Sequence, residues 1–194
     1  MTAMPSDAVR DPRDEMIEHL PALRAFAVSL TRDAVAADDL VQDAIVKAWK
    51  NIGKFEPGTN LRAWLFTILR NTFYSDRRKA RREVGDADGA IAAQLSEKPR
   101  HDGKLAFTDF MKAFRKLPDE QREALILVGA SGFSYEEAAA TCGVAVGTVK
   151  SRVNRARQRL IELLGMRPDE PFELTDKATM TVITGGFSTL PFAS

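Results

Sequence analysis

A polar stretch rich in small residues divides the chain into two parts. Residues 84–103 read VGDADGAIAAQLSEKPRHDG, and their few apolar residues follow neither a helical nor a strand period. This composition is typical of a flexible linker. We therefore expect a tail at 1–14, a first module at 15–83, the linker at 84–104, a second module at 105–165 and a second tail at 166–194.

The basic residues gather in two islands, one in each module. The chain has 28 Lys and Arg against 27 Asp and Glu, so its net charge of +1 hides this distribution. Residues 61–82 hold seven bases and one acid, residues 147–160 hold five bases and no acid, and residues 83–103 hold five acids and two bases. Two basic islands on either side of an acidic spacer favour two contacts with one polyanion.

Apolar residues recur at spacings of three and four in both modules, which predicts an all-α fold of two small helical domains. One series begins at Met16 and ends at Leu30. Pro21 interrupts this series, and we expect it either to break the helix or to lie in the first turn of a helix that starts later. Asp33 is expected to cap the next helix, because its carboxylate can accept from free backbone N–H groups.

The segment 55–60 is expected to form a loop, since Pro57-Gly58 is turn chemistry. Thr59 or Asn60 can then cap a long basic helix. Trp49 and Trp64 lie on or beside the apolar stripes of their helices. We expect both indole rings to be core residues.

The segment Ser134–Leu160 has the pattern of a DNA-binding helix-turn-helix. A capping box at Ser134 and Glu137 starts a short helix, glycines bound the turn, and a basic helix follows. The second helix of this motif enters the major groove with its N-terminal residues foremost. The exposed early positions are expected to contact base edges; they are Lys150, Ser151, Asn154 and Arg155. The remaining basic positions are expected to hold phosphates; they are Arg152, Arg157 and Arg159.

Composition excludes several other classes. One cysteine and two distant histidines leave no disulfide framework and no metal site. The longest apolar run is about seven residues, whereas a membrane span needs about twenty. We find no phosphate-binding glycine loop and no nucleophile–base pair, so we expect no catalytic residues, no metal and no cofactor. A cytoplasmic protein that does not bind membranes is expected.

The order of several motifs resembles a group 4, or extracytoplasmic function (ECF), sigma factor of RNA polymerase. The motifs are DDLVQD at 38–43, KAW at 47–49, NLRAWLF at 60–66, RN at 70–71, LP at 117–118, VGTVKSR at 146–152 and RAR at 155–157. The wording of residues 123–138 is most similar to the EcfG subgroup, the general stress response sigma factors. The resemblance implies region 2 at about 15–83 and region 4 at about 105–165.

The resemblance also implies roles for the first module. Its acidic helix face would bind the coiled coil of the largest polymerase subunit through Asp39, Gln42 and Asp43. The loop at 55–60 would capture a flipped base of the −10 element. The residues implied in −10 contacts are Thr59, Asn60, Arg62, Arg70, Asn71, Tyr74, Arg77 and Arg78. Family members further imply a −35 element resembling GGAAC and a −10 element resembling GTT.

The resemblance implies protein partners beyond the core polymerase and its β-subunit flap. These are an anti-sigma factor of the NepR type and a PhyR-type protein that removes it. Two alternatives stay open from the residues: a sigma-like decoy of the PhyR type, and a plain helix-turn-helix regulator. A decoy of this type should carry a receiver domain after its helices. In a plain regulator, the acidic helix and the basic island of the first module would have no function.

Overall fold

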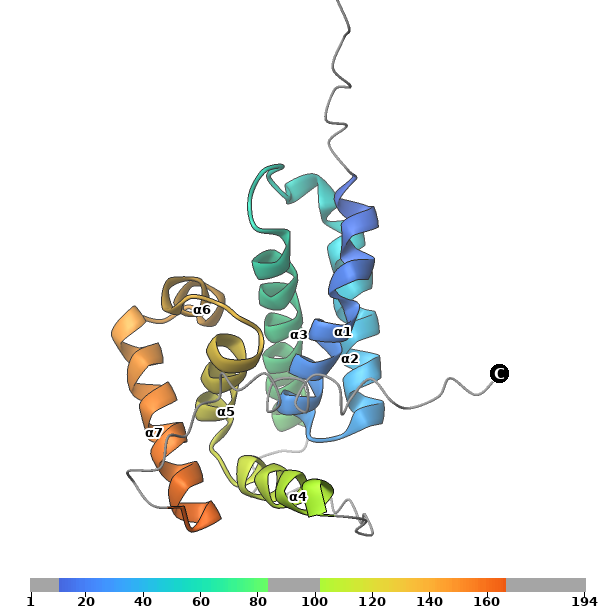
Figure 1. Ribbon diagram of the computed structural model, residues 1–194. Helices are drawn as coiled ribbons and strands as arrows, with labels where there is room; N and C mark the ends of the chain where they lie inside the picture. Colours follow the sequence, from blue (N-terminus) through green and yellow to red (C-terminus); the bar gives the residue numbers. More distant parts are fainter. Residues whose placement is uncertain (1–10, 84–101, 167–194) are drawn as a thin grey trace, which may run out of the picture.

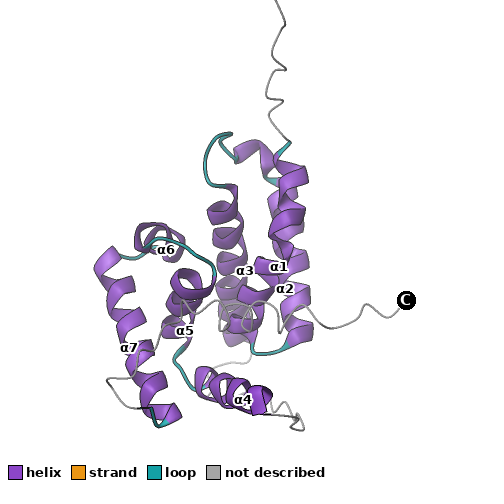
Figure 2. Cartoon of the chain, in the orientation of Figure 1, coloured by secondary structure: helices purple, strands orange, loops and turns teal. Residues whose placement is uncertain are grey.

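The computed structural model describes residues 11–83 and 102–166. Expectations for both tails and for linker residues 84–101 lie outside these ranges. The described residues are helical and contain no strand, as the periodicity predicted (Figure 2). No helix in the described ranges is both long and apolar enough to cross a bilayer.

The first module is a bundle of α1 (Pro12–Thr31), α2 (Ala34–Lys50) and α3 (Leu61–Glu83), with the short 3₁₀ helix η1 (Ile52–Lys54) after α2. Asp33 caps α2 as predicted, since its carboxylate accepts from the backbone N–H of Ala36 at 2.8 Å. The expectation for Pro21 was wrong. Helix α1 begins at Pro12 and continues through Pro21. Packing of α1 against α2 and α3 outweighs the loss of one backbone hydrogen bond.

The core of the first module contains residues from all three helices, among them Leu23, Phe26, Leu65 and Phe66. The expectation for Trp49 was wrong, because its side chain is 53% exposed. Trp49 lies in the last turn of α2, where the guanidinium of Arg13 is 5.2 Å from its ring centroid. The expectation for Trp64 was closer to the structure. Trp64 is partly buried, and its ring packs on that of Phe55 at 5.4 Å between centroids.

The second module contains α4 (Asp102–Arg115), α5 (Asp119–Leu125), the π-helix η2 (Ile126–Ala130), α6 (Tyr135–Cys142) and α7 (Val146–Leu164). Helix α4 begins at Asp102, so it takes up the last residues of the expected linker. Pro118 precedes α5, and the helix continues through η2 to Ala130.

The two modules pack against each other and share one continuous apolar core. Helix α3 contacts α6, and α1 contacts α5 (Figure 1). A row of aromatic rings crosses the boundary: Phe26 and Phe66 lie 5.0 Å apart, and Phe66 and Phe133 lie 4.9 Å apart between centroids. Phe66 therefore belongs to both cores at once.

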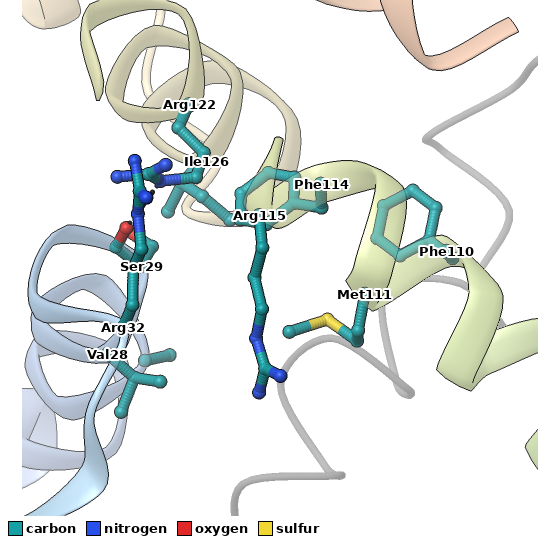
Figure 3. A pocket seen from close by; sticks show the side chains of 10 residues that line it. Val28, Ser29, Arg32, Phe110, Met111, Phe114, Arg115, Arg122 and Ile126 are labelled. Atoms are coloured by element: carbon teal, nitrogen blue, oxygen red, sulfur yellow. Dashed lines mark hydrogen bonds between the residues drawn. The ribbon is translucent and has the colours of Figure 1, made fainter. Parts of the chain in front are cut away.

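A small hollow lies where α1, α4 and α5 meet. Its lining is mostly apolar and includes Val28, Phe110, Met111 and Phe114, with arginine side chains around it (Figure 3). Its volume of about 30 Å³ is enough for a water molecule but not for an organic ligand.

Candidate nucleic-acid interface

The helix-turn-helix of α6 and α7 is fixed by the caps that the sequence predicted. The hydroxyl of Ser134 accepts from the N–H of Glu137 at 3.1 Å, and the Glu137 carboxylate accepts from the N–H of Ser134 at 2.8 Å. The N–H of Ser134 lowers the pKa of Glu137 by stabilising its ionised form. Gly143 ends α6 at a φ of 66°, a left-handed conformation that glycine adopts without steric cost.

Helix α7 has one buried and one exposed side. The buried side holds Val149, Val153, Ala156 and Leu160, each fully covered. Of the four predicted base-reading residues, Lys150, Asn154 and Arg155 are exposed and Ser151 is half-buried. The ammonium of Lys150 lies 5.6 Å from the ring centroid of Tyr135, and the hydroxyl of Ser151 donates to the carbonyl of Thr148. The structure thus brings the four residues together on the early part of one helix face.

The three predicted phosphate contacts differ in their exposure. Arg159 is exposed and forms an ion pair with Glu162 at 2.9 Å. Arg157 is half-buried, and its Nε is buried without a hydrogen-bond partner among the described residues. Arg152 is 17% exposed, and its guanidinium lies 3.3 Å from the Glu120 carboxylate. Residue 152 is three positions after Val149 and four before Ala156, so it lies beside the buried stripe and faces α5.

The start of α3 is joined to the second module. The side-chain amide oxygen of Asn60 (Oδ1) accepts from the N–H of Ala63 at 3.0 Å, so Asn60, one of the two predicted candidates, caps α3. Its amide nitrogen donates to Glu137 at 2.7 Å. The guanidinium carbon of Arg62 lies 4.9 Å from the ring centroid of Phe133 and 5.7 Å from that of Phe66. Arg62 therefore covers the aromatic row at the module boundary.

The middle of α3 holds a buried ion pair across the modules. Nε of Arg70 donates to the Glu123 carboxylate at 2.5 Å, and the hydroxyl of Tyr74 donates to the other oxygen at 3.3 Å. The Glu123 side chain is fully buried and that of Arg70 is 18% exposed. Burial raises the pKa of Glu123, although the neighbouring Arg70 acts in the opposite direction.

The end of α3 meets a second acidic residue of α5. Arg77 donates to Asp119, which also accepts from Arg32 of the first module and from Arg122, both at 2.8 Å. Burial acts to raise the pKa of Asp119, but the hydrogen bonds from Arg77 and Arg122 lower it overall. Arg122 is itself buried, and its Nε donates to the carbonyl of Ser29 at 2.7 Å. Arg122 and Ser29 lie close together in Figure 3.

The other predicted −10 residues, Thr59, Asn71 and Arg78, are exposed. The Thr59 hydroxyl donates to the carbonyl of Glu56 within the loop. Sequence reasoning missed Asp119, Glu123 and the buried Arg122 as parts of the module boundary. It singled out Glu137 for the capping box but missed its hydrogen bond with Asn60. Charged residues at 122 and 123 directly before the apolar run 124–128 were the available signal.

The acidic face of α2 is open. Asp39, Gln42 and Asp43 are exposed, whereas the neighbouring Asp38 pairs with Arg24 at 2.6 Å. Asp39 and Asp43 line an open groove of about 350 Å³ between α2 and α3. The predicted polymerase-binding residues thus lie together on one accessible surface.

Two other features of the described residues concern chemistry. Burial raises the pKa of the Cys142 thiol to about 12, so the thiol is un-ionised and packed. No group of three potential metal ligands occurs in the described ranges.

Comparison with known proteins identifies both modules. Residues 16–83 match the family described as Sigma-70 region 2, and residues 107–160 match Sigma-70, region 4. The sequence is 57% identical over 174 residues to the ECF RNA polymerase sigma factor EcfG of Rhodopseudomonas palustris, covering 90% of this chain and 95% of that protein. The chain is an ECF sigma factor. The resemblance seen in the sequence is confirmed.

Solved structures agree with this assignment. The sigma factor RpoE of Bartonella quintana, in complex with the anti-sigma factor NepR, is 57% identical to this sigma factor, with a TM-score of 0.71, covering 81% of this chain and 98% of that one. The PhyRSL–NepR complex from Sphingomonas sp. Fr1 contains a chain that is 21% identical, with a TM-score of 0.56, covering 77% of this chain and 85% of that one. The second similarity concerns the fold alone.

Proposed function

We propose that this ECF sigma factor directs core RNA polymerase to promoters of the general stress response. Its second module reads the −35 element through α7, and its first module contacts the −10 strand through α3 and the loop before it. The chain acts in the cytoplasm and has no catalytic activity of its own. The exposed basic face of α7, which holds Lys150, Asn154 and Arg155 at the start of a capped helix-turn-helix, is the observation that carries the proposal.

The acidic face of α2 supports the role at polymerase. Asp39, Gln42 and Asp43 offer carboxylate and amide groups on one accessible side of a helix. Charge complementarity with a basic coiled coil of the largest subunit would steer and orient binding. The β-subunit flap would receive the second module.

The regulation we propose follows the relatives. NepR is the anti-sigma partner of the 57% identical RpoE, and we propose that a NepR-type protein binds this sigma factor until a PhyR-type protein removes it. The sigma-like decoy is less well supported. Identity to the PhyRSL chain is 21%, against 57% to EcfG, and a decoy has no need of a basic recognition helix.

Transcription in vitro tests the proposal directly. Purified core polymerase is supplied with this protein and a template carrying a GGAAC −35 and a GTT −10 element. We expect a specific transcript that depends on the protein and is lost on a template with a scrambled −35 element. Adding a NepR-type protein should abolish it. Core polymerase that produces no transcript with this protein, but does so with a known ECF sigma factor, would refute the proposal.

A further inference from the structure

One aromatic ring lies beside the predicted base-reading residues of α7. Tyr135 is the first residue of α6 and directly follows the capping residue Ser134. It is half-buried and packs against the core of the second module. The position of its ring is therefore fixed by the start of α6, which the capping box holds in place.

The ring lies next to the ammonium group of Lys150, near the start of α7. The Nζ atom of Lys150 is 5.6 Å from the centroid of the Tyr135 ring, which is within the range of a cation–π interaction. Lys150 is otherwise exposed to solvent. The two helices of the motif thus meet at a predicted base-reading side chain.

An aromatic ring holds a cation differently from a carboxylate. Arg159 of the same helix pairs with Glu162 at 2.9 Å, so part of its charge is neutralised before DNA arrives. Within the described ranges Lys150 has no carboxylate partner. The face of a ring attracts the ammonium group without neutralising it, and the N–H donors remain available. Lys150 is therefore oriented by the protein and keeps its charge for DNA.

Orientation before binding favours contact with DNA bases. A lysine has a flexible four-carbon side chain, and a hydrogen bond with a base edge removes most of its rotational freedom. In the free protein the ring of Tyr135 already restricts Lys150. A side chain that is ordered in advance loses less entropy on binding, which strengthens the contact with the correct base.

Orientation also separates bases from phosphates. An ammonium group is a compact point charge, so an unrestrained lysine binds a nearby phosphate as readily as a base. Phosphate contacts carry no sequence information. The ring of Tyr135 holds the ammonium near the start of α7, the part of a recognition helix that enters the major groove first.

We propose that Tyr135 is a positioning residue for base reading by Lys150. Its ring holds the ammonium group where the N7 and O6 acceptors of a guanine in the −35 element bind it. Tyr135 thereby sets the selectivity of the helix without contacting a base itself. This inference rests on the proposed function, since it takes α7 to read the −35 element.

The test measures binding of the full chain to two fluorescent duplexes, one with a GGAAC −35 element and one with that element scrambled. Discrimination is the ratio of the two dissociation constants, measured by anisotropy at one salt concentration. Tyr135→Leu removes the ring and keeps an apolar side chain. We expect it to lower discrimination about two- to fivefold, which corresponds to an exposed cation–π interaction. Tyr135→Phe is the matched control: it keeps the ring and should discriminate as the wild type does.

The same substitution in a Lys150→Met background separates positioning from packing. There Tyr135→Leu should leave discrimination unchanged, because no ammonium group remains to be positioned. Equal losses in both backgrounds would mean that the ring only packs the motif, and would overturn the proposal. Wild-type discrimination in Tyr135→Leu would also overturn it, as would an equal loss in Tyr135→Phe, which would assign the effect to the hydroxyl. Tyr135→Met serves as the second variant if circular dichroism shows that Tyr135→Leu has lost helix.

The two proposals fail in different ways. Wild-type protein that supports promoter-specific transcription, with equal discrimination in wild type and Tyr135→Leu, removes the positioning role and keeps the sigma function. Absence of transcription with a working core polymerase removes the sigma function itself.

Discussion

The side-chain amide of Asn60 donates a hydrogen bond of 2.7 Å to the carboxylate of Glu137, and each of these residues also caps a helix of its own module. Asn60 accepts from the N–H of Ala63 at the start of α3, and Glu137 accepts from the N–H of Ser134 at the start of α6. The two helix starts are therefore joined through one pair of side chains. A substitution at residue 60 can therefore remove the hydrogen bond to Glu137 and keep the cap of α3.

Asn60→Asp should loosen the module boundary and leave α3 intact. Aspartate caps helices about as well as asparagine, but it places a carboxylate against Glu137. We expect unchanged helix content by circular dichroism and a larger radius of gyration by X-ray scattering. Asn60→Ala is the comparison: it removes the cap as well and should cost about 1 kcal/mol of unfolding free energy. Equal scattering from wild type and Asn60→Asp would contradict this account.

Arg155→Ala and Lys150→Ala should reduce selectivity at the −35 element. Each base-reading contact is worth about 1–3 kcal/mol of discrimination. Binding to cognate and scrambled −35 duplexes, measured at one salt concentration, gives the discrimination directly. Arg159→Ala is the control, because a phosphate contact weakens binding to both duplexes alike. An equal loss on both duplexes for Arg155→Ala would leave it a phosphate contact.

Asp39→Lys should weaken binding to core polymerase and leave the fold unchanged. The side chain is exposed on the open face of α2, so the reversal disrupts charge complementarity without burying a charge. Affinity for core polymerase, measured by biolayer interferometry, should fall at least tenfold. Asp109→Lys reverses an exposed acid on α4 and should bind as the wild type does. Wild-type affinity in Asp39→Lys would remove this face from the interface.

Arg122→Met should destabilise the protein by about 3 kcal/mol. Methionine fills similar volume, but the carbonyls of Ser29 and Leu117 lose the donors that satisfy them, and buried unsatisfied groups cost about 1–3 kcal/mol each. Urea denaturation followed by circular dichroism measures the change. Arg115→Met, at an exposed arginine beside the hollow, should change stability by less than about 0.5 kcal/mol. A similar small change at residue 122 would show that water satisfies both carbonyls.

Asp119 should make the stability of the folded chain depend on pH in the acid range. Its pKa in the folded chain lies below the usual 3.8, because Arg77 and Arg122 bind the ionised form. The stability it contributes is thus fully present above about pH 3.8 and is lost as pH falls through the lower folded pKa. The pKa of Glu123 is raised by burial, so the stability it contributes is present at low pH and lost as pH rises through its folded value.

Comparing wild type with Asp119→Asn cancels the contribution of Glu123. The difference in melting temperature between the two proteins should be large at pH 7 and should shrink as pH falls below about 3.8. A difference that stays constant over this range would mean that Asp119 acts through packing rather than through its charge.

The sequence predicted what depends on neighbouring residues. The cap at Asp33, the capping box from Ser134 to Glu137 and the buried stripe of α7 are all local patterns, and the structure contains each of them. The path of α1 through Pro21 was not predictable, because contacts with α2 and α3 outweigh the local preference of proline. Trp49 shows the same limit: a helix stripe does not reveal where its covering helices end.

The module boundary was beyond sequence reasoning for a further reason. Arg70 and Glu123 are 53 positions apart, and no local pattern pairs them. Each charge also had another interpretation. The family resemblance implied a contact of Arg70 with −10 DNA, and Glu123 was only the first residue of a stretch similar to the EcfG subgroup. Their burial follows from the packing of α5 against the first module.

The shared place of Phe66 in both cores has a consequence for the lifetime of the protein in the cell. Opening the chain uncovers the rings of Phe66 and Phe133, and an exposed aromatic patch favours aggregation. A molecule that opens away from polymerase also presents helices that have lost part of their packing, which proteases cleave more readily. Release from an inhibitor without capture by polymerase would then shorten the half-life of the chain, so the amount of active protein would follow the supply of free polymerase.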